Sequence, residues 1–274
     1  MRVTGRLAPT PSGHLHLGNA LAFAAAWLSA RAQGGRLLLR IEDLDRARAR
    51  DDIANAQRDD LRWLGITWDD ESPPQSTRAY SVGDLPVFRC VCTRATRLAG
   101  GCRCRDAHHT EGPWRFRAPR EALRFTDRVW GEQRFAPDED PVLMRADGEA
   151  AYPLAVVVDD LRDGVTEVVR GADLLSATAT QLLLYRCLGA RPPSWTHVPV
   201  IYGPDGKKLS KSHGSTELRA LRAGGWSAER VWSALLPLLG MPGDAPDPMR
   251  FDPARVPRRH YVAHPDGSLT PRAG

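Results

Sequence analysis

The sequence contains no long hydrophobic run. Its longest apolar stretch, residues 20–28, is rich in alanine and much shorter than the ~20 residues that a membrane-spanning helix requires. The N-terminal residues also lack a basic region, an apolar stretch and a cleavage site in the order found in signal peptides. We therefore expect a soluble, cytoplasmic protein with no membrane partner.

Lysine is almost absent. Only three of the 38 basic residues are lysines, and Lys207, Lys208 and Lys211 lie within five positions of one another. An ammonium group is a compact charge on a flexible stem, whereas the planar guanidinium group of arginine favours bidentate partners. The pattern predicts a mobile loop whose Lys208 and Lys211 close over a polyphosphate. A solvated basic loop is the alternative interpretation.

Cysteine is also scarce. Four of the five cysteines, Cys90, Cys92, Cys102 and Cys104, form two Cys-x-Cys pairs separated by nine residues. In a chain without an export signal, such clustering indicates a metal site before it indicates disulfides. Four thiolates can hold a tetrahedral zinc ion, which would stabilise an insertion too small for a core of its own. Because structural zinc sites usually have Cys-x-x-Cys spacing, free thiols or a redox pair are the alternatives.

The composition suits a folded protein with an anionic partner. Of 274 residues, 42% are hydrophobic, which is ample for a buried core in one large domain or in a core with an insertion. The net charge of +5 and the pI of about 9.2 fit a nucleic acid or a nucleotide without distinguishing between them.

The first part of the chain alternates between strand and helix patterns. Residues 3–10 are typical of a strand, residues 16–35 of a helix, residues 36–45 of a buried strand that ends in carboxylates, and residues 51–64 of a second helix. This alternation predicts an α/β fold with a doubly wound parallel sheet, in which ligands bind at the carboxyl ends of the strands.

The alternation stops in residues 72–141, which contain many prolines and arginines and the four clustered cysteines, so we expect an insertion there. It then resumes with three predicted strands and two predicted helices, at residues 152–160, 165–171 and 197–203, and at residues 176–189 and 226–240. The tail, residues 241–274, is rich in proline, aspartate and arginine and is expected to be partly disordered.

A turn rich in proline and glycine, residues 8–13, connects the first strand to the first helix and is followed by His14 and His16. The start of a helix offers free backbone N–H groups and the positive end of the helix dipole, where a phosphate binds. Imidazoles at this place can donate hydrogen bonds to phosphate oxygens whose charge grows in a transition state. A turn followed by a helix cap is the alternative without function.

Two short motifs resemble a known family. The "HLGN" of residues 16–19 and the "KLSKS" of residues 208–212 resemble the HIGH and KMSKS signatures of class I aminoacyl-tRNA synthetases, although Asn19 replaces the last histidine. The segments "RIEDLD" at residues 40–45 and "VTEVVRGADLL" at residues 165–175 resemble the glutamyl branch of that family. The resemblance therefore implies the Rossmann-like fold and the ATP chemistry of these enzymes.

The chain is short for the glutamyl branch, because the residues after the lysine loop are too few for an anticodon-binding domain. The short form and the Cys-x-Cys insertion resemble the glutamyl-Q tRNA(Asp) synthetases. This resemblance implies a catalytic domain at residues 1–240, ending in a short helical part and interrupted at residues 72–141 by a zinc-binding, acceptor-type insertion, with a C-terminal tail at residues 241–274.

Enzymes of that family activate L-glutamate with ATP and Mg²⁺ and transfer it to the queuosine base in the anticodon of tRNA(Asp). We expect this activity here, in a monomer. A truncated glutamyl-tRNA synthetase that charges the 3′ end of a tRNA and a non-catalytic paralogue that binds tRNA or adenylate are the alternatives. The arginine-rich insertion and "RVPRRHY" at residues 255–261 are candidates for contacts with tRNA phosphates, or else solvated surfaces.

The resemblance also implies roles for single residues. Arg6 would pair with the side-chain carboxylate of glutamate, a charge-assisted contact, and Glu42 would hold its α-amino group. The other implied glutamate contacts are Leu7, Ala8, Pro9, Thr10, Tyr152 and Arg170. The implied ATP contacts are His14, His16, Gly18, Asn19, Lys208, Ser210 and Lys211, of which His16, Lys208 and Lys211 are the implied catalytic residues. His14 is as well explained by a structural role, and His108 or His109 could replace Cys102 or Cys104 as a zinc ligand.

Overall fold

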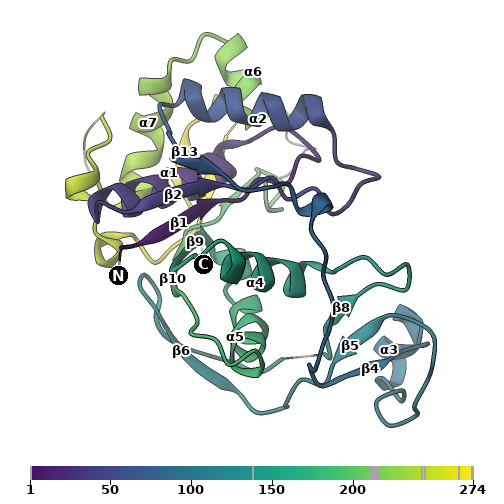
Figure 1. Ribbon diagram of the computed structural model, residues 1–274. Helices are drawn as coiled ribbons and strands as arrows, with labels where there is room; N and C mark the ends of the chain where they lie inside the picture. Colours follow the sequence, from purple (N-terminus) through teal and green to yellow (C-terminus); the bar gives the residue numbers. More distant parts are fainter. Residues whose placement is uncertain are drawn as a thin grey trace.

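Figure 1 shows a computed structural model of the protein, which describes residues 2–137, 139–209, 216–241, 243, 245–264 and 266–272. The predicted strand–helix alternation of the first part is confirmed by β1 (Thr4–Leu7), α1 (Leu17–Ala32), β2 (Arg36–Leu39), α2 (Asp51–Trp63) and β3 (Asp70–Glu71). The three strands pair in parallel in the order β1-β2-β3. None of the helices in the described residues is long and apolar enough to cross a membrane.

A second sheet continues the α/β core. Its strands are β6 (Leu123–Asp127), β7 (Gly131–Phe135), β9 (Glu167–Gly171) and β10 (Ser194–Val198), in the order β7-β6-β10-β9. β10 is parallel to both of its neighbours, and only the edge strand β7 is antiparallel. β1 lies beside β9, where the amide of Thr166 donates to the carbonyl of Thr4 at 2.9 Å. The predicted Rossmann-like α/β fold is therefore confirmed, with mixed rather than purely parallel sheets.

The helix α1 forms the centre of the hydrophobic core. It packs against β1 and β9, and the side chains of Leu21, Ala24, Ala25 and Leu28 are fully buried. Alanine at so many positions allows the helix to approach the strands closely, because its side chain is small. This close packing fixes the start of α1 next to the carboxyl ends of β1 and β9.

Residues 152–160, which the sequence predicts as a strand, instead begin the helix α4 (Tyr152–Arg162). A short, continuous apolar run suits a buried helix as well as a buried strand, so its periodicity could not decide. Pro153 lies in the first turn, where its fixed φ and missing N–H favour a helix start. α4 packs against α5 (Ala177–Cys187) and carries Asp159 and Asp160 into the interior.

The cysteine cluster lies in the connection between β4 (Val87–Arg89) and β5 (Trp114–Phe116), which also contains α3 (Arg94–Gly100). With β8 (Val142–Met144), these strands form a separate antiparallel sheet. In Figure 1 this sheet lies at the lower right, at the opposite end of the molecule from α2. β6 and β7 also come from the predicted insertion, but they belong to the second sheet, with β9 and β10.

The C-terminal part covers one side of the core. Its elements are β11 (Ile201–Tyr202), α6 (Leu218–Ala223), α7 (Ala228–Leu235), η4 (Leu236–Leu239), η5 (Pro248–Arg250), η6 (Pro253–Arg255), β12 (Tyr261–Ala263) and β13 (Leu269–Pro271). Two 3₁₀ turns, η1 (Gln75–Thr77) and η2 (Ala172–Leu174), lie earlier in the chain. The predicted strand 197–203 is thus divided between β10 and β11. The tail, for which we expected partial disorder, contributes β12 and β13 to a sheet with β11.

Candidate active site and metal centre

A hollow of about 410 Å³ lies at the carboxyl end of β1. The turn that follows β1, with His14 and His16, forms one wall, and Lys208 and Leu209 contribute to another. The side chain of Gln57 in α2 fixes the turn by donating to the carbonyls of Thr10 at 3.0 Å and Gly13 at 2.8 Å. We call residues 207–209 the lysine segment. The structure therefore brings together the turn and the lysine segment, which lie far apart in the sequence.

His16 caps the N-terminus of α1. Its Nδ1 accepts hydrogen bonds from the amides of Gly18 at 3.1 Å and Asn19 at 3.3 Å, and Asn19 Oδ1 accepts from the amide of His16 at 3.1 Å. The predicted helix cap is therefore present. Because Nδ1 accepts, the neutral ring carries its proton on Nε2. A Nε2–H group is the donor that a phosphate oxygen requires, so the cap and the predicted phosphate contact are compatible.

Gly18 and His14 also shape this hollow. A Cβ atom at Gly18 would lie 3.0 Å from Cε1 of His16, so a larger residue would disturb the cap. His14 Nδ1 is buried and has no hydrogen-bond partner among the described residues. His14 lines the hollow, which places it within reach of a ligand there.

Lys208 forms an ion pair with Asp173 in η2, at the end of β9. About half of its side chain is exposed (52%), so the ammonium group can exchange this partner for another anion. Ser210 and Lys211 lie outside the described residues, and their predicted ATP contacts stay predictions. The chain returns to the site directly after this loop, because the amide of Leu218 donates to the carbonyl of Leu15 at 2.8 Å.

Arg170, on β9, is buried among neutral partners. Its guanidinium group donates to His197 Nε2 at 3.0 Å, to the hydroxyl of Tyr152 at 3.2 Å and to Gln181 Oε1 at 2.8 Å, and also to the carbonyl of Leu174 and the hydroxyl of Thr178. No carboxylate pairs with it within the described part of the chain. Burial lowers the pKa of Arg170, and the nearby Arg6 acts in the same direction, whereas Tyr152 and Asp160 act against them.

The ring of His197 links Arg170 to Asp127 through hydrogen bonds. Its Nε2 accepts from Arg170, so Nδ1 carries the proton and donates to Asp127 Oδ2 at 2.7 Å. Burial lowers the pKa of His197, which keeps the ring neutral beside the guanidinium group. Asp127 thus orients His197, and His197 orients Arg170.

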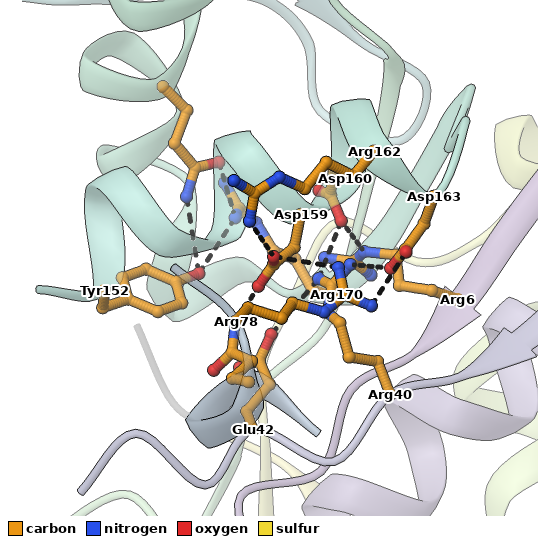
Figure 2. A network of polar contacts seen from close by, with 12 residues as sticks. Arg6, Arg40, Glu42, Arg78, Tyr152, Asp159, Asp160, Arg162, Asp163 and Arg170 are labelled. Atoms are coloured by element: carbon orange, nitrogen blue, oxygen red, sulfur yellow. Dashed lines mark hydrogen bonds and ion pairs between the residues drawn. The ribbon is translucent and has the colours of Figure 1, made fainter. Parts of the chain in front are cut away.

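Arg6 and Arg40 share one buried carboxylate of α4. Asp160 Oδ1 lies 3.5 Å from Arg6 Nε and 2.7 Å from Arg40 Nη2. Arg6 also donates to the carbonyl of Val169 at 3.2 Å. Figure 2 shows the acidic side chains of α4 among arginines that come from β1, from the end of β2 and from β9. The residues that were predicted to bind the substrate glutamate therefore lie in one polar cluster. They are Arg6, Glu42, Tyr152 and Arg170.

Glu42 lies at the edge of this cluster. Its carboxylate accepts from Arg40 Nη2 at 3.3 Å and only 11% of the side chain is exposed. Burial raises the pKa of Glu42, although Arg40 and Arg6 act in the opposite direction. An added ammonium group would compensate the buried carboxylate, which is what the α-amino group of an amino acid supplies.

The sequence did not reveal the outer part of this network. Arg78 donates to Asp159 and to Asp163, each at 2.9 Å, and Arg40 reaches Asp163 at 3.1 Å. Arg78 comes from the predicted insertion, Asp159 comes from the segment misread as a strand, and Asp163 lies just after that segment. The one signal was the pair of aspartates at the end of an apolar run, which indicated polar groups at a buried position.

The four clustered cysteines form a candidate metal centre. Their sulfur atoms all lie within 4.8 Å of one another, with Cys90 Sγ 3.5 Å from Cys102 Sγ and Cys92 Sγ 3.3 Å from Cys104 Sγ. Tetrahedral coordination with Zn–S bonds of ~2.3 Å places sulfurs ~3.8 Å apart, so the arrangement fits a metal ion of that size. The four cysteines thus make a complete ligand set without His108 or His109.

Gly112 explains how the cysteine segment folds so tightly. It has a φ of +92°, and a Cβ atom there would collide with the carbonyl of Cys90. The amide of Cys90 donates to the carbonyl of Pro113 at 3.1 Å, which fixes β4 next to β5. A glycine is required where the two backbones approach this closely.

Comparisons with known proteins fit this geometry. The family described as "tRNA synthetases class I (E and Q), catalytic domain" matches residues 2–85 and 102–246. The Glutamyl-Q tRNA(Asp) synthetase of Symbiobacterium thermophilum is 43% identical to this chain, over 93% of the chain and 94% of the relative. The chain belongs to the glutamyl-Q tRNA(Asp) synthetase family. It is therefore a ligase-type paralogue of the aminoacyl-tRNA synthetases.

Members of the wider glutamyl branch are also similar. Glutamate--tRNA ligase 2 of Paramagnetospirillum magneticum is 39% identical over 89% of this chain and 57% of the ligase. The crystal structure of a glutamate-tRNA synthetase from Elizabethkingia anophelis superposes with a TM-score of 0.66 and 26% identity, over 78% of this chain and 53% of that chain. The glutamyl-Q family thus shares its catalytic fold with the glutamate–tRNA ligases.

Proposed function

We propose that the protein activates L-glutamate with ATP and Mg²⁺ and transfers it to the queuosine base at the anticodon wobble position of tRNA(Asp). The observation that carries the amino-acid specificity is the buried Arg170, whose partners in the described structure are neutral. The acceptor is supported by similarity, over nearly the whole chain, to relatives that bear the name Glutamyl-Q tRNA(Asp) synthetase.

The polar cluster suits a dianionic amino acid. Arg6 takes the side-chain carboxylate, Glu42 takes the α-ammonium group, and Tyr152 and Arg170 complete the contacts. Ala8, Pro9 and Thr10, which follow Arg6 closely in the chain, line the hollow beside His16. A glutamate bound in this way presents its α-carboxylate toward the place where a nucleotide fits.

Activation requires positioning and charge stabilisation rather than a covalent protein intermediate. The α-carboxylate of glutamate attacks the α-phosphorus of ATP in line, and the bond to pyrophosphate breaks. His16 Nε2–H, Lys208 and Lys211 stabilise the phosphate charge, with His14, Gly18, Asn19 and Ser210 around the nucleotide. Lys208 leaves Asp173 when the triphosphate binds. In the second step a hydroxyl of the modified base attacks the glutamyl carbonyl, loses its proton and displaces AMP.

We further propose that the four cysteines hold one structural zinc ion. Four thiolates select zinc among the common cellular metals, and the closed ligand set leaves no position for a substrate. The ion would hold β4, β5 and α3 together, because this small sheet has a cluster of only a few buried apolar side chains around Phe88. The protein is proposed to act as a monomer in the cytoplasm.

One assay tests the function in two stages. The pure protein is incubated with ATP, Mg²⁺ and labelled glutamate, and we expect pyrophosphate exchange that depends on glutamate and not on aspartate or glutamine. Labelled glutamate should then attach to tRNA(Asp) that contains queuosine and not to the same tRNA without it. Label on the 3′-terminal adenosine would favour the second candidate, a glutamate–tRNA ligase, which the similarity to such ligases also supports.

A further inference from the structure

Three rings from different elements meet beside the lysine segment. Trp130 lies in the turn between β6 and β7, Tyr202 ends β11, and His260 precedes β12. The ring of His260 lies 5.4 Å from that of Trp130 and 5.8 Å from that of Tyr202, measured between centroids. The guanidinium carbon of Arg272 lies 3.9 Å from the centre of the Tyr202 ring. We call these four residues the aromatic–arginine patch.

The backbone holds the patch in place. Trp130 Nε1 donates to the carbonyl of His197 at 2.9 Å, and His260 Nδ1 accepts from the amide of Val200 at 3.1 Å. The amide of Arg272 donates to the carbonyl of His260 at 2.9 Å. These contacts already hold the rings and the backbone of Arg272. Binding of a ligand that stacks on the patch would therefore cost little conformational entropy in the protein.

The patch is positively charged and partly open to solvent. The rings of Trp130, Tyr202 and His260 are half-buried, whereas Arg272 and the neighbouring Arg258 and Arg259 are exposed. No ion pair with a carboxylate is found for these three arginines within the described residues. Burial and Arg272 lower the pKa of His260, so its ring is neutral near pH 7 and can serve as a stacking surface.

The patch adjoins the site of activation. The backbone of Tyr202 pairs with Lys208, and the amide of Gly203 donates to the carbonyl of Lys207 at 2.7 Å, which closes the turn that leads into the lysine loop. Lys208 in turn reaches Asp173, which is close enough to His260 to act on its pKa. The patch therefore lies at the rim of the nucleotide hollow, on the side of the C-terminal tail.

We propose that the aromatic–arginine patch stacks an unpaired RNA base adjacent to the nucleotide that receives glutamate, while Arg258 and Arg259 contact the flanking phosphates. The proposal rests on the proposed function, because it supplies the surface that holds the acceptor RNA. Unpaired bases stack on aromatic rings and on guanidinium planes in many RNA-binding proteins. The exposed arginines add the charge complementarity that a phosphate backbone requires. The rings in this patch belong to β11, to the β6–β7 turn and to the tail, so the stacking surface also gives the tail strands a role.

Binding of a fluorescein-labelled RNA hairpin with the anticodon stem and loop of tRNA(Asp) tests the proposal. We expect Tyr202→Ala and Arg272→Ala each to raise the dissociation constant about tenfold, since one stacked base contributes ~1–3 kcal/mol. Arg258→Ala, which removes one of the proposed phosphate contacts, should reduce the magnitude of the slope of log affinity against log salt concentration by about 0.7, the effect of one lost phosphate contact with a single strand. Tyr202→Phe, which retains the ring, should bind like the unaltered protein.

Two controls make the result decisive. Arg191→Ala removes an exposed arginine before β10, at the end of the strands away from the hollow, and should leave the hairpin affinity unchanged. Glutamate-dependent pyrophosphate exchange, measured without RNA, should stay unchanged in both patch variants. Hairpin affinities equal to that of Arg191→Ala, or a loss of exchange in both patch variants, would overturn the proposal. Failure of the proposed function is seen separately, as the absence of glutamate from the queuosine of whole tRNA(Asp) with the unaltered protein.

Discussion

Two arginines at the site, Arg40 and Arg170, are almost equally buried but differ in the charge of their partners. Arg40 pairs with Asp160, Glu42 and Asp163. Burial alone would lower its pKa, but Asp160 and Glu42 raise it overall. Arg170 faces hydroxyl, amide, imidazole and carbonyl groups. A buried charge without a counterion is costly, so its presence indicates a site that an anionic ligand completes. We therefore expect Arg40 to be structural, and we propose Arg170 as a binding group.

Glu42 should make glutamate activation depend on pH. The carboxylate must be ionised to hold the α-ammonium group, and burial raises its pKa in the free protein. As the pH falls through this raised pKa, Glu42 becomes neutral and the KM for glutamate in pyrophosphate exchange should rise. The rise should begin above the range of an ordinary glutamate side chain, whose pKa is about 4.3.

Glu42→Gln tests this assignment. A lost hydrogen bond to a charged group costs ~1.5–3 kcal/mol, so the KM should increase ~10- to 150-fold and no longer respond to pH in that range. Glu71→Gln is the matched control, because Glu71 is exposed and pairs with Arg58 on the surface. An unchanged KM in Glu42→Gln would contradict the role given to this residue.

The sequence identified single residues of the candidate site more readily than the residues that contact them in the fold. Arg6, Glu42, Tyr152 and Arg170 were implied by the family resemblance, and the structure places them in one cluster. Asp160, which orients Arg6, could not be assigned, because its position depends on how α4 packs against the strands. A motif indicates residue types at fixed spacings, whereas an ion pair between distant segments depends on tertiary packing.

At the start of α1, the side chain of His16 has two roles in this account, as a helix cap and as a proposed phosphate contact. His16 closes the first turn through Nδ1, and the same residue lines the hollow, where we propose that its imidazole contacts phosphate. Stability and activity can be separated there, since asparagine is a strong helix cap that lacks the imidazole donor.

His16→Ala and His16→Asn should therefore differ in stability and agree in activity. Alanine removes the cap and should lower the free energy of unfolding by about 1 kcal/mol, while asparagine should preserve it within a few tenths. Both variants should slow glutamate-dependent exchange about a hundredfold, which is typical of a lost donor to a developing phosphate charge. Urea unfolding and exchange rates measure the two effects, and full exchange activity in His16→Asn would count against a phosphate contact.

The helix α4 shows where element prediction from this sequence fails. Its run of apolar residues has neither the alternation of an exposed strand nor the polar face of a surface helix, because α4 is buried on most sides. The elements with one polar face, such as α2, were predicted correctly. Periodicity distinguishes a helix from a strand most reliably when one face of the element meets water.

On the scale of the whole molecule, the active site and the cysteine cluster belong to different sheets. The sheet of β4, β5 and β8 lies at one end of the molecule, while the hollow lies between β1, α1 and the lysine segment. We therefore expect the cysteines to contribute to stability and not to the chemical step. The spacing of the cysteines predicted their proximity, and the fold around Gly112 accounts for it.

Metal removal should destabilise the protein without a direct effect on the activation chemistry. We expect about one zinc ion per chain by elemental analysis, as for a four-cysteine structural site. A chelator should lower the Tm, and Cys104→Ser should lower both the zinc content and the Tm. Cys187→Ser is the control, because Cys187 is exposed and lies in α5 outside the cluster. A metal-free preparation with an unchanged Tm would remove zinc from the account.

The identity of the acceptor is the central claim, and mass spectrometry of the modified nucleoside tests it most directly. Queuosine-containing tRNA(Asp) is incubated with the protein, ATP, Mg²⁺ and glutamate, digested to nucleosides under mildly acidic conditions and compared with untreated tRNA. The account predicts a queuosine that is heavier by one glutamyl group, formed only when ATP and glutamate are both present. An unmodified queuosine together with glutamate on the 3′-terminal adenosine would contradict it.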